Sequence, residues 1–128
     1  PNKNLQVGPF SITFLQTKHP VTCYAMRITA GGKTVVYSGD SSYIEQFIPF
    51  TQAADLFICE SNLYAHQDGS TMGHMTCKEA GEIAVKAGVK ELWLSHLPHY
   101  GNHEDLIVDA KQQFSGSIKL AKSGLVWE

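Results

Sequence analysis

Residues Asp55–Cys59 read DLFIC, and this nearly continuous apolar run predicts a strand that is buried on both faces of a sheet. After a polar loop, Thr76–Glu79 (TCKE) has the T-x-x-E form of a capping box, which predicts the start of a helix. Apolar side chains then recur at helical spacing, at Ala80, Ile83, Ala84 and Ala87. Gly88 predicts the end of that helix, and Lys90–Leu97 (KELWLSHL) follows as the next strand. A strand, a helix and a strand in succession indicate an α/β protein.

The segments on either side of this unit extend the pattern. Further strands are predicted at Phe10–Leu15, Thr22–Thr29, Lys33–Ser38, Ser117–Ala121 and Leu125–Trp127. Gly31-Gly32 is expected to form a hairpin turn between the second and third of these. Helices are predicted at Ser42–Ala53, where Pro49 weakens the pattern, and from an N-cap at Asn102 through Phe114. Because the opening and closing strands resemble antiparallel segments, we expect one mixed sheet with helices on its outer face.

Composition excludes several classes of protein. Of 128 residues, 43% are apolar and 17% charged, which is typical of a globular domain rather than a disordered chain. A formal net charge of −2 argues against a domain that binds by neutralising many phosphates. No apolar run approaches the ~18 residues of a membrane span, and no signal peptide is visible. Cys23, Cys59 and Cys77 form no C-x-x-C pair, so we expect buried thiols and a cytoplasmic protein.

Residues that can bind metal ions lie at the ends of predicted strands. His19 precedes the second strand, Asp40 follows the third, and His96 lies near the end of Lys90–Leu97. His74 lies in a Gly-His loop before the capped helix. Taken singly, each has an ordinary interpretation as a surface or core histidine or as a turn aspartate. Loops at one edge of a sheet commonly carry the functional site of an α/β protein, so their joint placement indicates a site.

Four motifs in order resemble the metallo-β-lactamase superfamily. Two of them are Thr17–Pro20 (TKHP), which is followed by Tyr24–Ile28, and Val36–Asp40 (VYSGD). The other two motifs are similar to the ribonuclease Z-like branch of that superfamily. They are Gly73–Thr76 (GHMT), which follows Glu60-Ser61-Asn62, and Leu94–Tyr100 (LSHLPHY). The resemblance covers almost the whole chain. It implies that residues 1–128 are the C-terminal half of a hydrolase domain with the αββα metallo-β-lactamase sandwich fold.

The resemblance also implies roles for individual residues. His19 would bind one metal ion and His96 a second, while Asp40 would bridge both. His74 would face the scissile phosphate as a catalytic group, and Glu60 would either support the site or be structural. Imidazole and carboxylate ligands suit two divalent ions, zinc or alternatively manganese. Two such ions can activate a bridging water, and a protonated His74 can donate to the leaving group.

The sequence departs from the family at one decisive point. The H-x-H-x-D-H motif, which supplies four further ligands, is absent. Because three ligands cannot hold two ions tightly, we expect the chain alone to be inactive. The first residue is Pro1 rather than Met, so we expect a piece of a longer protein.

The substrate class follows from two further departures. Only 21 positions separate His19 from Asp40, where the tRNA-processing relatives usually insert a long arm. The segment His96–Tyr100 also differs from their H-x-S-x-R-Y form; His99 is either a phosphate contact or, as we favour, a surface histidine. His66 and His103 receive no role. We therefore expect a small phosphodiester as substrate, with nucleic acid less favoured.

Three alternatives to this function stay open. The protein could process tRNA 3′ ends, or act as a thioesterase or lactamase-type hydrolase on the same fold. It could also be a binding or structural module without metal.

Half of a sandwich would expose one face of its sheet, and each Å² of apolar surface left in water costs about 25 cal/mol. We therefore expect association with the missing N-terminal half or with a second copy of the chain, and no contact with a membrane.

Overall fold

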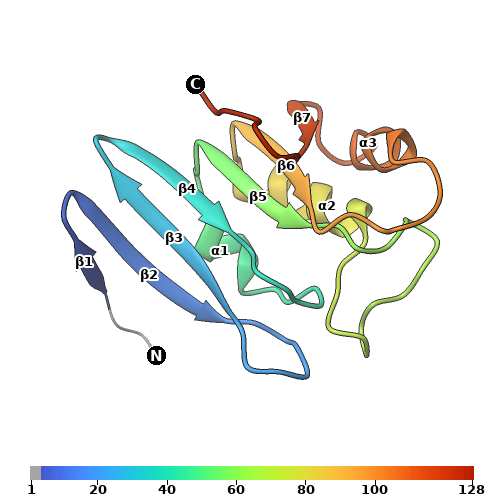
Figure 1. Ribbon diagram of the computed structural model, residues 1–128, viewed down its shortest axis with the longest axis horizontal. Coiled ribbons are helices and arrows are strands. Elements are labelled where there is room, and N and C mark those ends of the chain that lie inside the picture. The colour runs from blue at the N-terminus through green and yellow to red at the C-terminus, as the bar shows by residue number, and fades with distance from the viewer. Residues whose placement is uncertain (1–3) are drawn as a thin grey trace.

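A computed structural model describes residues 4–128 (Figure 1). Its seven strands form one sheet in the order of the sequence. The strands are β1 (Leu5–Val7), β2 (Phe10–Gln16), β3 (Tyr24–Ala30), β4 (Lys33–Tyr37), β5 (Leu56–Glu60), β6 (Glu91–Ser95) and β7 (Ser117–Leu120). The helices are α1 (Phe47–Thr51), α2 (Cys77–Ala87) and α3 (Glu104–Ala110). The prediction of an α/β chain with one mixed sheet is confirmed.

The central strands are parallel, and each is joined to the next through a helix. β4 pairs with β5, β5 with β6, and β6 with β7 in parallel register. β5 is the strand predicted from DLFIC; Leu56, Phe57 and Cys59 are buried, which agrees with a strand covered on both faces. The carboxyl ends of these strands therefore meet at one edge of the sheet.

The predicted capping box begins α2. The Thr76 hydroxyl accepts a hydrogen bond from the Glu79 amide at 3.1 Å, and the Thr76 amide donates to Glu79 Oε1 at 2.9 Å. Gly88 ends the helix with a φ of 69°, the left-handed conformation that glycine adopts without strain. Ile83 and its alanine neighbours on the apolar face are buried against the sheet.

The first four strands form an antiparallel meander. β2 pairs with β3 and β3 with β4, and the β3–β4 turn at Gly31-Gly32 has positive φ at both glycines, as a tight hairpin requires. β1 was not predicted; it pairs with β2 through only three residues. Because β2 is antiparallel to β3, its carboxyl end lies at the same edge as that of β4.

Three parts of the sequence-based prediction are wrong. The closing segment is not antiparallel: β7 runs parallel to β6, because α3 carries the chain back across the sheet. Leu125–Trp127 is no strand. The helix expected over Ser42–Ala53 is reduced to α1, and that expected from Asn102 begins at Glu104, although Asn102 Oδ1 accepts from the Glu104 amide at 3.1 Å.

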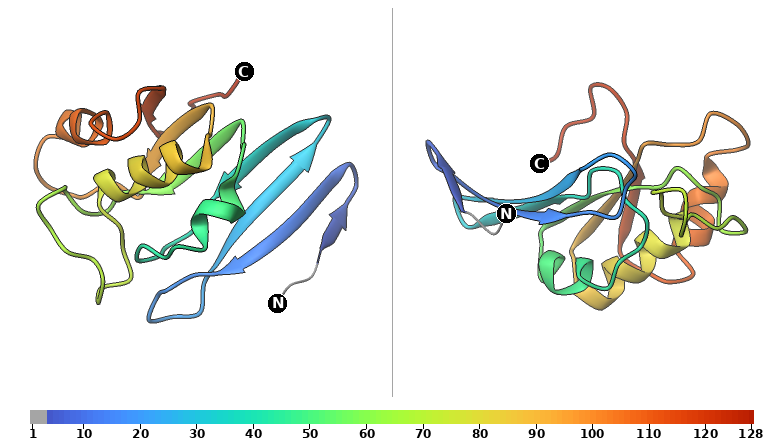
Figure 2. Two further views of the ribbon diagram at one scale, coloured as in Figure 1. Left: turned by 180° about the vertical axis from the view of Figure 1, so that it is seen from behind. Right: turned by 90° about the horizontal axis from the view of Figure 1, so that it is seen from below.

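The helices cover one face of the sheet (Figure 2). Ala25 and Val36 lie on this covered face and are fully buried. Side chains alternate along a strand, so Met26 and Tyr37 point to the opposite face, where no helix lies. Several large apolar side chains of the meander are exposed, namely Leu5, Val7, Phe10 and Tyr37. Among the described residues, no helix is long and apolar enough to cross a membrane.

The three cysteines are free, as the sequence predicted. Cys59 and Cys77 are buried, and Cys23 is partly exposed. Burial raises the pKa of the Cys59 thiol well above its ordinary value and that of Cys77 to about 11. These two thiols are therefore packing groups rather than nucleophiles.

Candidate metal centre

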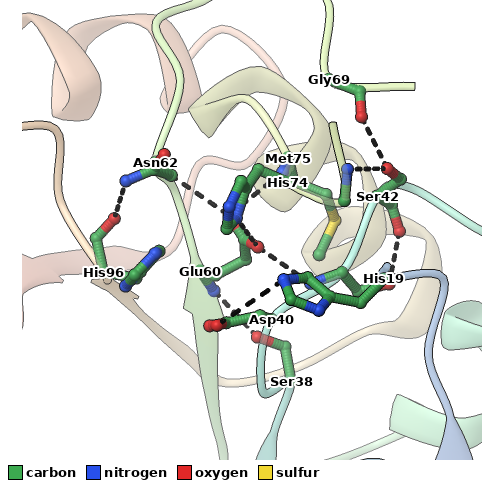
Figure 3. A network of polar contacts seen from close by, with 12 residues as sticks. His19, Ser38, Asp40, Ser42, Glu60, Asn62, Gly69, His74, Met75 and His96 are labelled. Atoms are coloured by element: carbon green, nitrogen blue, oxygen red, sulfur yellow. Dashed lines mark hydrogen bonds and ion pairs between the residues drawn. The ribbon is translucent and has the colours of Figure 1, made fainter. Parts of the chain in front are cut away.

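The predicted site residues come together at the edge where β2, β4, β5 and β6 end (Figure 3). His19 lies on the loop after β2, Asp40 on the loop after β4, and His96 directly after β6. His74 comes from the long loop between β5 and α2. Four loops that are distant in the sequence thus bring three imidazoles and a carboxylate to one place.

His19 and Asp40 form the closest pair of predicted ligands. His19 Nε2 lies 4.0 Å from Asp40 Oδ2, with the two side chains 16% and 36% exposed. His19 Nδ1 lies 3.1 Å from the Val21 carbonyl oxygen, to which it can donate. Nδ1 also lies 3.3 Å from the Val21 amide nitrogen and 3.6 Å from the Cys23 sulfur, so Nδ1 is engaged in local contacts and Nε2 is the nitrogen nearest Asp40. Imidazole nitrogen and carboxylate oxygen are both ligands that zinc accepts, so His19 and Asp40 would be suited in type to hold an ion.

His74 lies between the other two histidines. Its ring centroid is 5.5 Å from that of His19 and 5.1 Å from that of His96. Its Nδ1 lies 2.8 Å from Glu60 Oε1. A carboxylate only accepts hydrogen bonds, so Nδ1 carries the proton and Nε2 is left to face the site.

Glu60 accepts hydrogen bonds on both carboxylate oxygens although its side chain is only 1% exposed. Oε1 accepts from the Ser41 amide and from His74 at 2.8 Å each. Oε2 accepts from the Met75 amide at 3.1 Å and from the Asn62 amide at 3.3 Å. Such a set of donors compensates the burial of a carboxylate. Glu60, whose role the sequence left open, therefore ties the Asp40 loop to the His74 loop.

His96 has a strained backbone. Its φ of 52° lies in the left-handed region, which residues other than glycine adopt at a cost of about 1–3 kcal/mol; Ala53, away from the site, is the other such residue among those described. Its carbonyl oxygen accepts from Asn62 Nδ2 at 3.2 Å. The side chain of His96 is thereby turned to the edge where His74 lies, and the two rings stack.

The donor set suits a metal centre in type but is incomplete. Imidazole nitrogens and a carboxylate are good ligands of zinc or manganese. Within residues 4–128, however, no three His, Cys, Asp or Glu side chains are close enough together to hold an ion. His19, Asp40 and His96 therefore lie at one edge of the sheet without forming a closed set of ligands, and their assignment as ligands stays a prediction.

The other histidines have different surroundings. His103 Nε2 contacts the Pro98 carbonyl oxygen at 2.6 Å, His66 stacks on Tyr64, and His99 is exposed. Sequence reasoning missed Asn62 and Ser42, which contact the site loops through hydrogen bonds. Neither residue type carries a signal for this role, because serine and asparagine are common in any loop.

A family model described as the Beta-lactamase superfamily domain matches residues 1–97. The chain belongs to the beta-lactamase superfamily. Along all 128 residues it is 59% identical to "Probable metallo-hydrolase YhfI" of Bacillus subtilis (strain 168). The chain superposes on a crystal structure of YhfI with a TM-score of 0.98 at 60% identity. The superposition includes the whole of this chain and 53% of YhfI. The resemblance and the fold inferred from the sequence are confirmed.

Two more distant matches are a relative in sequence and a similar structure. "Ribonuclease Z" of Brevibacillus brevis is 39% identical over 93 residues, which is 65% of this chain and 29% of the relative. A diphosphatase of the PhnP family superposes with a TM-score of 0.75 at 19% identity, over the whole chain and 47% of that protein, and shows the fold alone. All 128 residues of the chain match YhfI, but they span only 52% of the length of that protein. The chain is the C-terminal half of this fold.

Proposed function

We propose that this chain is half of a metal-dependent phosphodiesterase that hydrolyses small phosphodiesters with two divalent ions, zinc or manganese. One observation carries the proposal: a buried Glu60 holds His74 between His19 and His96, with Nε2 facing the site. A positioned side chain that transfers a proton commonly assists such hydrolysis, and the placement of His74 supports that role. The relatives of this chain with the names metallo-hydrolase and ribonuclease Z support a hydrolase of this class.

Each residue has a distinct part in the proposed reaction. His19 and His96 would each bind one ion through imidazole, and Asp40 would span both ions with its two oxygens. When bound, the ions supply an activated water and stabilise the negative charge of the phosphoryl group. His74 Nε2 would hold a proton for the departing oxygen, and Glu60 would stabilise the imidazolium that carries it.

The preference for small substrates rests on the short connection between two ligands. Between His19 and Asp40 lie only β3 and β4, joined by the Gly31-Gly32 hairpin. No arm extends there to grip a polynucleotide, and the net charge of −2 offers little phosphate attraction. Processing of tRNA 3′ ends is the second candidate, favoured by the similarity to ribonuclease Z.

The uncovered face of the sheet supports a proposal about the partner. Leu5, Phe10 and Tyr37 are 48%, 46% and 40% exposed, and such apolar surface favours association. We infer that the N-terminal half, with the remaining ligands, packs there; a second copy of this chain is the alternative. Light scattering of the 14.1 kDa chain alone should show self-association or aggregation, and a well-folded monomer would contradict this inference.

The function is tested on the protein that contains both halves. We expect it to bind two equivalents of Zn²⁺ or Mn²⁺ and to hydrolyse bis(p-nitrophenyl) phosphate in preference to a thioester or a β-lactam. The 128-residue chain should be inactive in the same assay. Hydrolysis of a thioester or β-lactam alone would assign a different reaction to the fold. An absence of bound metal in the two-half protein would indicate a binding or structural module.

A further inference from the structure

A second buried side chain joins the loops of the candidate metal centre. Ser42 is 0% exposed and lies two residues after Asp40. Its hydroxyl donates to the Gly69 carbonyl oxygen at 2.6 Å and accepts from the Gly73 amide at 3.0 Å. Its own amide donates to the Lys18 carbonyl oxygen at 2.8 Å. Ser42 therefore connects the loop that carries His19 with the loop that carries His74.

The contact between these two loops is too close for any side chain. A Cβ on Gly73 would lie 2.8 Å from His19 Cδ2 and 2.6 Å from Pro20 Cδ, which is shorter than van der Waals contact. The backbone of Gly73 thus packs directly on the His19 imidazole. Because His74 is the next residue, the position of Gly73 fixes both rings relative to each other.

The same loops enclose space beside His19. A cavity of about 320 Å³ is lined by Lys18, His19, Pro20, Ser42, Ser70, Thr71 and Gly73. A molecule that enters this cavity reaches His19 between the two loops. The separation of the two loops therefore sets how closely Gly73 approaches His19.

We propose that Ser42 is a positioning residue, whose hydroxyl holds Gly73 against His19 and so sets the geometry of the His19–His74 pair. The inference rests on the proposed function, because His19 is taken as a metal ligand and His74 as a proton donor. Groups that orient a ligand from behind typically change metal affinity or activity by about 10- to 100-fold when removed. Ser42 acts through other residues and touches neither the metal nor the reacting atoms.

The test compares Ser42→Ala with Ser61→Ala in the two-half protein. Ser61 is also 0% exposed, and among residues 4–128 its hydroxyl has no hydrogen-bond partner, so Ser61→Ala removes a buried hydroxyl without breaking a bond. We expect Ser42→Ala to weaken Zn²⁺ binding by about 10- to 100-fold, measured by competition with a chromophoric chelator. Its kcat on bis(p-nitrophenyl) phosphate should fall by a similar factor, with KM changed less than about threefold.

Gly73→Ala serves as a second variant, because it leaves the Ser42 hydroxyl intact and displaces His19 directly. It should weaken Zn²⁺ binding at least as much, and an unchanged Zn²⁺ affinity in a folded Gly73→Ala protein would overturn the inference even if Ser42→Ala does not fold. Equal Zn²⁺ affinity and kcat in Ser42→Ala and Ser61→Ala would overturn the inference, as would a loss of thermal stability without either change. A wild-type protein that binds Zn²⁺ and hydrolyses the substrate separates that failure from a failure of the proposed function.

Discussion

The rim of the candidate metal centre and the layer beneath it use polar groups differently. The ligand rim consists of the three proposed ligands, His19, Asp40 and His96, and the supporting layer consists of Ser42 and Glu60. In the rim, the His19–Asp40 contact measures 4.0 Å and the carboxylate is 36% exposed. In the supporting layer, both residues are buried and their hydrogen bonds measure 2.6–3.3 Å. The side chains of Ser42 and Glu60 thus have their hydrogen-bond partners within residues 4–128, whereas no three rim side chains there lie close enough together to hold an ion.

The largest effect is expected at His74, which connects the two regions. His74→Asn removes the proton donor, so we expect kcat on bis(p-nitrophenyl) phosphate to fall by about 10²- to 10⁴-fold in the two-half protein. Bound Zn²⁺, measured by elemental analysis, should stay unchanged because His74 is not expected to bind metal. A kcat within about threefold of wild type would remove His74 from the proposed mechanism.

Substitutions in the supporting layer should lower the free energy of unfolding more than substitutions in the ligand rim. Glu60→Ala leaves the Ser41, Asn62 and Met75 amides without their acceptor, at about 1–3 kcal/mol for each unsatisfied group. We expect the free energy of unfolding of the metal-free two-half protein, from urea denaturation, to fall by about 3 kcal/mol or more. A loss below about 1 kcal/mol would show that water or other groups replace the carboxylate.

Substitutions in the ligand rim should weaken metal binding and leave the stability of the metal-free protein nearly unchanged. Asp40→Asn is expected to weaken Zn²⁺ binding at least about tenfold, or about 1.4 kcal/mol, in titration calorimetry. The metal-free protein should keep its stability within about 0.5 kcal/mol, because the carboxylate is partly exposed. If Asp40→Asn lowered the free energy of unfolding as much as Glu60→Ala, the distinction between rim and supporting layer would be lost.

The smallest effect is expected outside both regions. His99 is exposed, and its ring is not part of the cluster formed by His19, His74 and His96. We expect His99→Ala to change kcat/KM by less than about twofold. A tenfold rise in KM would instead make His99 a phosphate contact, the alternative that the sequence left open.

The features predictable from sequence are those with local causes. DLFIC marked β5 and TCKE marked the start of α2, since burial and capping depend on neighbouring residues. The direction of β7 was predicted wrongly, because it depends on how α3 crosses the sheet. Leu125–Trp127 has a strand-like composition, but the strand order ends at β7.

The same distinction applies to the site. His19, Asp40, His74 and His96 were identified because their residue types can bind metal ions or transfer protons and they lie at strand ends. Ser42 and Asn62 were missed because their importance lies in contacts across 27 and 34 positions of the chain. Only the folded arrangement shows that Gly69 and His96 are the groups they bind.

The incomplete ligand set has a thermodynamic consequence. No three donors within residues 4–128 can hold an ion, so under the proposed function the ions require ligands from both halves. Metal binding and association of the halves are then linked equilibria. Any factor by which Zn²⁺ strengthens association of the halves must equal the factor by which association strengthens Zn²⁺ binding. Separately produced halves would therefore behave as a metal-dependent heterodimer, whose dissociation constant reports the free Zn²⁺ concentration.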